Sequence, residues 1–111
     1  MEIWKYQLAI EGEQTIEVPE GARFLSLIEQ NERPTLYFLV DPQRRKATLT
    51  VGMLGTGQPA PDNLVDCAQY LGTVSTVAGR FVWHVFVLMD DGYAFLHWPV
   101  CHLTHAMTRV K

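Results

Sequence analysis

The amino-acid sequence predicts a mainly β protein: a small antiparallel β-sandwich or barrel of about seven or eight strands with one or two short helices. Apolar residues recur with a period of two or in short runs, which is typical of strands. Gly, Pro, Asn and Asp bound these runs, as they do in turns. The chain has 111 residues, the size of one domain, so residues 1–111 are expected to form a single domain.

Five strands are predicted in the N-terminal half. Residues 3–10 alternate, with Trp4, Tyr6, Leu8 and Ile10 on the apolar side. Residues 14–18 also alternate, and the turn sequence PEGA follows them. Residues 23–30 suit a helix nearly as well as a strand, but the segment is short and lies between two turns, so we expect a strand. Residues 35–40 carry apolar side chains on both faces, and residues 47–54 form the next strand.

The C-terminal half is expected to contain one or two helices and the central strand. Asp62 or Asn63 could cap a short helix within residues 62–70, and residues 71–77 return to β character. Residues 81–89 are the most hydrophobic and β-prone segment, so we expect them at the centre of a sheet. DDG at 90–92 predicts a hairpin into a strand over 93–98, and residues 101–110 suit a short terminal helix.

Composition narrows the classes of partner. The net charge is −3 and the nine basic residues are scattered, which argues against binding to duplex nucleic acid. No signal peptide opens the chain, and its longest apolar-rich stretch, 81–89, is too short to cross a bilayer, so no membrane association is expected. Cys67 and Cys101 are the only cysteines, and we expect free thiols in a reducing compartment, the cytoplasm.

A set of short motifs occurs in order between residues 3 and 86. These are IWKY at 3–6, EQTIEVPEGARFLSL at 13–27, LYFLVDP at 36–42, GTGQP at 55–59, YLGTV at 70–74 and FVWHVF at 81–86. Together they resemble a family of short, uncharacterised phage and prophage proteins. The resemblance implies a phage origin, and hence the cytoplasm of an infected bacterial host, but it brings no activity and no catalytic residues. Residues 87–111 extend beyond it.

The sequence GTGQPAP at 55–61 is the most conspicuous loop. Its spacing matches no nucleotide-binding fingerprint, and Pro59 and Pro61 remove two backbone donors where a phosphate-binding helix would begin. We therefore expect a strand-ending loop that forms one wall of a ligand pocket shared with aromatic and arginine side chains. The candidate ligand-binding residues are Gly55, Thr56, Gly57, Gln58, Trp4, Tyr6, Trp83, Arg44, Arg45 and Arg80, with Trp98 and Arg23 as further candidates.

Histidines provide the remaining candidates for chemistry. His84 lies in an otherwise apolar strand and is interpreted as a core residue whose ring finds backbone or hydroxyl partners; catalysis would need Asp90, Asp91 or Cys67 beside it. The tail contains a weak set of candidate metal ligands, whose spacing fits no standard zinc module: His97, Cys101, His102 and His105. No catalytic residue, metal or cofactor is predicted.

These observations favour a non-enzymatic phage accessory protein of the counter-defence type, which neutralises a host factor. It would block a host defence protein or sequester a small nucleotide-type signal. Apolar residues on both faces of several strands favour a homo-oligomer. A small His/Cys-dependent enzyme or metal protein, and a minor structural protein of the virion, remain as alternatives.

Overall fold

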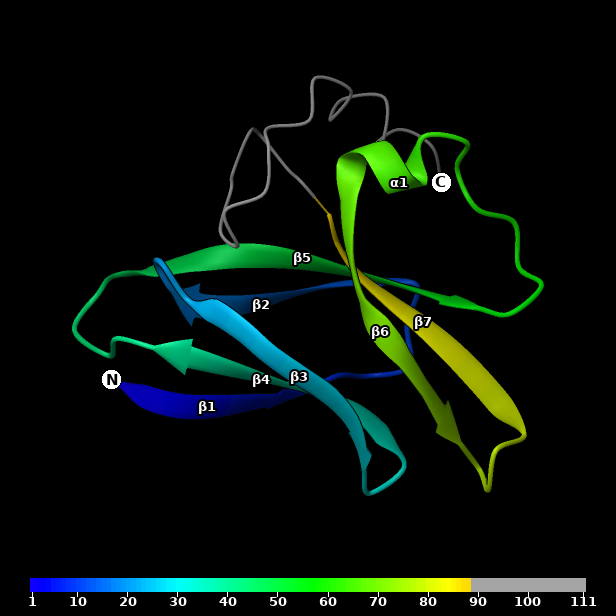
Figure 1. Ribbon diagram of the computed structural model, residues 1–111, viewed down its shortest axis with the longest axis horizontal. Helices are drawn as coiled ribbons and strands as arrows, with labels where there is room; N and C mark the ends of the chain where they lie inside the picture. The colour runs from blue at the N-terminus through cyan, green and yellow to red at the C-terminus, as the bar shows by residue number, and fades with distance from the viewer. Residues whose placement is uncertain (89–111) are drawn as a thin grey trace.

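The computed structural model describes residues 1–88 and confirms the mainly β prediction (Figure 1). Its seven strands and one short helix are β1 (Glu2–Gln7), β2 (Glu13–Pro19), β3 (Arg23–Gln30), β4 (Arg33–Val40), β5 (Lys46–Gly55), α1 (Leu64–Cys67), β6 (Ala68–Thr76) and β7 (Phe81–Leu88). They form two antiparallel sheets that do not close into a barrel. The alternation of apolar and polar residues therefore identified the fold class.

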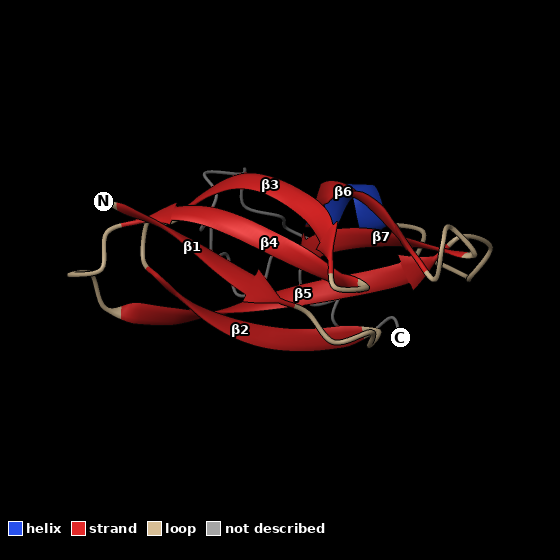
Figure 2. Ribbon diagram, turned by 90° about the horizontal axis from the view of Figure 1, so that it is seen from below, coloured by secondary structure: helices blue, strands red, loops and turns tan. Residues whose placement is uncertain are grey.

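The two sheets lie one above the other, as Figure 2 shows from the side. One sheet has three strands in the order β1-β4-β3, and the other has four in the order β2-β5-β7-β6. The apolar strand β7 lies between β5 and β6, as predicted. A hydrogen bond connects the turns that follow β3 and β6: the Val77 amide nitrogen donates to Oε1 of Glu32 at 2.5 Å. The sheets are thus linked by a polar contact as well as by the core.

The core fills the space between the sheets. Phe38 of β4 is fully buried and meets the rings of Tyr6 and Phe24 edge-on, with centroids 5.8 and 5.9 Å away. This geometry places the positive edge of one ring against the negative face of another. The other buried residues come from both sheets and include Leu36, Val40, Leu49, Val51, Met53, Val85 and Val87.

A β-bulge explains why residues 23–30 resemble a helix in sequence. Phe24 pairs with Phe38, but the next pair is Ser26 with Tyr37, so Leu25 is an extra residue in β3. The bulge allows Phe24 and Leu27 both to pack against the core although they are three positions apart. The segment is a strand, as predicted, and the bulge gives its apolar residues a helix-like spacing.

The first strand is shorter than predicted. β1 ends at Gln7, because the chain bends at Ala9, whose amide and carbonyl are both hydrogen-bonded by the Gln14 side chain at 3.0 and 2.8 Å. Leu8 is still fully buried, and its amide donates to the Pro34 carbonyl. Ile10, placed on the apolar face by the prediction, is instead exposed.

The helix predicted within residues 62–70 is reduced to the single turn α1. Asn63 occupies the N-cap position without a side-chain capping bond, and Ala68 is already extended. Tyr70 pairs with Phe86 in the sheet, so strand pairing overrides the local helical pattern. The hairpin predicted at 90–92, the strand over 93–98 and the helix over 101–110 lie outside the described residues.

The prediction of free thiols is wrong for Cys67. This side chain, from the last residue of α1, is fully buried and is not a free thiol. A count of two cysteines is compatible with either state, which is why the sequence could not decide it. Cys101 lies outside the described residues.

Candidate functional site

The outer face of the four-stranded sheet carries a second apolar cluster. Val85 and Val87 of β7 point into the core between the sheets. Because side chains alternate along a strand, Phe86 and Leu88 point to the opposite face. There they pack with Cys67 and with Leu54, Leu64 and Ala68. Both faces of β7 are therefore apolar, and within residues 1–88 the 55–64 segment covers part of the outer face.

The GTGQPAP loop is fixed against β7 by its first four residues. The Gln58 amide donates to the Gly55 carbonyl at 3.0 Å, and the Gln58 side chain accepts from the Gly55 amide at 2.5 Å. Gly57 has φ +94°, a conformation that glycine adopts without steric cost. The Thr56 amide donates to the Val82 carbonyl of β7. The turn therefore directs the following prolines across the outer face of the sheet.

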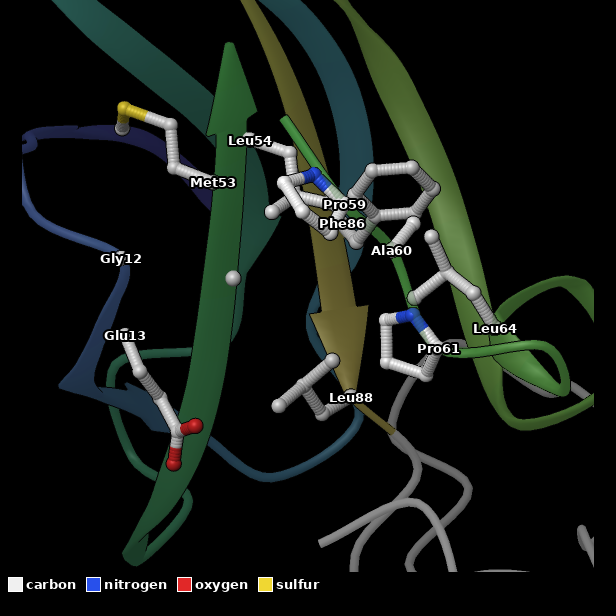
Figure 3. A pocket seen from close by; sticks show the side chains of 11 residues that line it. Gly12, Glu13, Met53, Leu54, Pro59, Ala60, Pro61, Leu64, Phe86 and Leu88 are labelled. Carbon is white, nitrogen blue, oxygen red and sulfur yellow. The ribbon is translucent and has the colours of Figure 1, made fainter. Parts of the chain in front are cut away.

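A pocket of about 450 Å³ lies between this loop and the sheet (Figure 3). That volume is within the range of small-ligand sites, roughly 300 to 1,000 Å³. Its apolar lining comes from β5, the loop, α1 and β7, and consists mainly of Leu54, Pro59, Pro61, Leu64, Phe86 and Leu88. Gly12 and Glu13 line the side nearest β2, and Glu13 carries the charge in this lining. The arrangement can take up an apolar group.

A polar cluster adjoins the pocket on the same face of the sheet. His84 precedes Phe86 by two positions in β7 and pairs with Leu54 of β5 on one side and Thr73 of β6 on the other. Its Nε2 lies 2.7 Å from Thr56 Oγ1, and its Nδ1 lies 3.1 Å from Thr73 Oγ1. The Tyr70 hydroxyl forms a hydrogen bond with Thr73 Oγ1. The centroid of the Tyr70 ring lies 5.2 Å from the centroid of the Phe86 ring.

The hydroxyl partners predicted for His84 are present, but His84 is only partly buried on the outer face of the sheet and is not a core residue. Its ring contacts the hydroxyl groups of Thr56, Thr73 and Tyr70. Cys67, one of the residues considered as a catalytic partner, instead accepts a contact from the Asn63 amide. Asp90 and Asp91 lie outside the described residues. A neutral hydroxyl group therefore faces each ring nitrogen, donating to one and accepting from the other.

The predicted glycine-loop residues lie beside the pocket. Gly55 and Gln58 form the turn, and Thr56 contacts His84, whereas the wall of the pocket itself is made by Pro59, Ala60 and Pro61. The loop is thus a pocket wall, but through the prolines that follow the glycines.

The predicted aromatic residues do not line this pocket. Trp4 donates to Glu2 at 2.7 Å, and Lys46 Nζ lies 5.9 Å from its ring centroid. Tyr6 and Trp83 pack against the core between the sheets. The Trp83 ring donates to Thr76 Oγ1 at 3.0 Å, on the face of β7 opposite Phe86.

The three predicted arginines lie in two loops away from the pocket. Arg44 and Arg45 lie between β4 and β5, at the opposite end of β5 from the glycine loop (Figure 1). Arg45 forms an ion pair with Glu20 at 2.9 Å. Arg80 lies in the turn between β6 and β7. Arg44 and Arg45 are therefore not brought together with the 55–58 turn, whereas Arg80 lies two residues before Val82, whose carbonyl accepts from the Thr56 amide. Arg23, the further candidate, begins β3 in the other sheet.

The metal candidates His97, Cys101, His102 and His105, like Trp98, lie outside the described residues. Within residues 1–88, His, Cys, Asp and Glu side chains form no group of three or more able to hold a metal ion. The same range contains one helix, the single turn α1, which is far too short to span a bilayer.

The pocket residues Leu54, Leu64, Phe86 and Leu88 were not predicted as site residues. A signal was present, because residues 81–89 are apolar at every position but one and therefore on both faces of the strand. The sequence does not tell which element covers the second face, so it does not predict a pocket there.

Comparison with known proteins gives one match. Residues 1–94 match a protein family described as a domain of unknown function (DUF7352). No curated protein and no solved structure matches the chain. The prediction of an uncharacterised family is confirmed, whereas the phage origin stays a prediction.

Proposed function

This chain belongs to the DUF7352 family, and we propose that it is a non-enzymatic phage accessory protein of the counter-defence type, which neutralises a host protein by binding it. The observation that carries the proposal is the apolar pocket on the outer face of the four-stranded sheet. It would act in the cytoplasm of the infected host. The family brings no activity of its own to this proposal.

The residues that form the floor and the wall of the pocket support a binding role. Its floor consists of Leu54 and Phe86, on paired strands of the sheet, and its wall contains Pro59 and Pro61, whose rings restrict the backbone. A rigid site of this kind loses little conformational entropy when it is filled. The pocket therefore suits the uptake of a bulky apolar side chain from a partner protein.

The charge around the pocket favours a protein over a nucleotide-type ligand. Phosphate groups are bound by arginine, lysine or converging backbone amides. Among residues 1–88, the pocket lining contains no arginine or lysine, and the predicted arginines lie in other loops. Of the two versions expected from the sequence, we therefore favour blocking of a host defence protein.

The pocket is tested with two neighbouring substitutions in α1. Leu64 lines the pocket, whereas Val65 is 82% exposed and does not. Leu64→Glu places a charge in the pocket and should abolish protection, measured as the plating efficiency of a defence-sensitive phage on a defended host that expresses the protein. Val65→Glu adds the same charge outside the pocket and should protect like the unmodified protein.

The same pair of variants identifies the target. The partner of the pocket would be a host protein that binds to the unmodified chain and to Val65→Glu but does not bind to Leu64→Glu. Equal protection by all three proteins would refute the role of the pocket. The sequestration alternative is tested by incubating each protein with host extract and then heating it to release bound ligand. Release of a nucleotide, in equal amount from the unmodified protein and from Leu64→Glu, would favour that alternative instead.

A further inference from the structure

The contacts around His84 leave one hydrogen-bond donor unused within their own cluster. Tyr70, Thr73 and Thr56 each have one hydroxyl hydrogen, and a neutral imidazole has one N–H, which makes four donors. The cluster uses three of them: one between Thr56 and Nε2, one between Nδ1 and either Thr73 or, at 3.5 Å, Tyr70, and one between Tyr70 and Thr73. One donor therefore remains for another acceptor.

This surplus does not depend on the tautomer of the ring. If Nε2 carries the hydrogen, it donates to Thr56 and the Thr56 hydroxyl hydrogen is left over. If Nδ1 carries it, Thr56 donates to Nε2, and the remaining hydrogen belongs to Thr73 or Tyr70. In both cases the cluster presents an O–H group, and a protonated ring would add one more donor.

The surplus donor lies close to the apolar pocket. His84 and Phe86 are two positions apart on one face of β7, which is about 7 Å along a strand. Leu54 lines the pocket and pairs directly with His84, while the Tyr70 ring contacts that of Phe86. A group seated on Phe86 and Leu54 could therefore carry a polar atom into reach of the cluster.

We infer that the Thr56–His84–Thr73–Tyr70 cluster is the polar half of the binding site, and that it donates a hydrogen bond to a carbonyl or carboxylate oxygen of the partner next to the apolar side chain in the pocket. This inference rests on the proposed function, because it concerns the same pocket. It defines the partner as a protein segment with a bulky apolar side chain and an oxygen acceptor a few bonds away.

Three probes of matched length test this specificity. 3-Phenylpropionate carries a carboxylate, 3-phenylpropionamide carries a neutral carbonyl, and 3-phenylpropylamine carries an ammonium group that only donates. Each Kd is measured by following backbone amide signals of Leu54 and Phe86 in NMR titrations. The two carbonyl probes should bind more tightly than the amine, the propionate by about tenfold or more, as expected for one hydrogen bond to a charged acceptor.

Electrostatics alone predicts the opposite order. The chain has a net charge of −3, so a simple charge effect would favour the ammonium probe. A preference for the propionate thus reports on the hydrogen-bond donors. Tighter or equal binding of the amine would overturn the inference while leaving the pocket as a binding site. Failure of all three probes would refute both the inference and the pocket's proposed role.

Substitutions that remove hydroxyl groups from the cluster provide a second test of the inference. The double variant Thr56→Val, Thr73→Val keeps the shape of both side chains and should reduce propionate affinity to that of the amine. Thr48→Val removes an exposed hydroxyl elsewhere on β5 and should leave the order of the probes unchanged. An unchanged preference in the double variant would exclude these hydroxyls as the donor. Thermal unfolding of each variant checks that it is folded.

Discussion

Nε2 of His84 lies 2.7 Å from Oγ1 of Thr56, which joins the middle of β7 to a loop 28 positions earlier in the chain. The backbone of Thr56 also bonds to Val82 of the same strand. These contacts hold the glycine turn against the sheet, and the prolines that follow it form the pocket wall. The polar cluster and the apolar pocket are therefore parts of one arrangement.

Thr56→Val should lower the free energy of unfolding by about 1 kcal/mol, because a ring nitrogen of His84 loses its hydroxyl partner. Urea unfolding measures this change. Thr48→Val is the matched control, since Thr48 is exposed on β5, and it should change stability by less than about 0.5 kcal/mol. Equal losses in the two variants would show that the Thr56 contact does not stabilise the fold.

Gly57→Ala should destabilise the protein by about 1 to 2 kcal/mol, because Gly57 has φ +94°, where a Cβ is unfavourable. No atom lies within 4 Å of the added Cβ, so the effect would be conformational. Gly12→Ala also meets open space, but without a positive φ, and should be neutral or slightly stabilising. Thermal unfolding compares the two; a neutral Gly57→Ala would contradict the turn geometry.

Tyr6→Phe should stabilise the protein by about 1 kcal/mol at neutral pH. The Tyr6 hydroxyl is buried and has no hydrogen-bond partner among residues 1–88, so its removal relieves a desolvation cost. Chemical denaturation of the two proteins at neutral pH measures the difference. A clear loss of stability in Tyr6→Phe would mean that the hydroxyl has a partner.

The same residue predicts a pH dependence. Burial raises the pKa of Tyr6 above its ordinary value of 10.0. The unfolded chain therefore ionises first, and the contribution of Tyr6 to stability, complete below about pH 10, is lost as the pH rises through the folded-state pKa. Unfolding measured on both sides of pH 10 should show a smaller decline for Tyr6→Phe than for the unmodified protein; parallel declines would exclude this linkage.

Phe38→Ala should cost about 3 to 5 kcal/mol, because it leaves a cavity between the sheets and removes the ring contacts with Tyr6 and Phe24. Phe81→Ala provides the control, since Phe81 is more than half exposed, and should cost far less. Denaturant midpoints report both changes. A small loss for Phe38→Ala would contradict its central position in the core.

The homo-oligomer expected from the sequence stays a prediction with a specific surface. Ile3 is 63% exposed and lies beside Leu39 on the outer face of the three-stranded sheet. Light scattering of the full chain should give a mass that is a multiple of 12.6 kDa, and Ile3→Glu should lower it. A mass of one chain for the unmodified protein would refute this prediction.

Much of the fold could be read from the sequence because its signals are local. Alternation placed Ile16 and Val18 on the inward side of β2, and the apolar run at 81–88 identified an internal strand. Predictions failed where a distant residue decides the outcome. Gln14 ends β1 by bonding to Ala9, and pairing of Tyr70 with Phe86 shortens α1. Such contacts depend on where the chain folds back.

The sequence by itself determined the β class, the positions of most turns and the character of the 55–61 loop, because backbone preferences and side-chain period belong to neighbouring residues. Only the tertiary structure decided that Pro59 and Pro61 face Phe86, that the arginines lie in other loops, and that Thr56 and Thr73 meet His84. The site joins residues from four segments, and strand order and register alone bring them to one face.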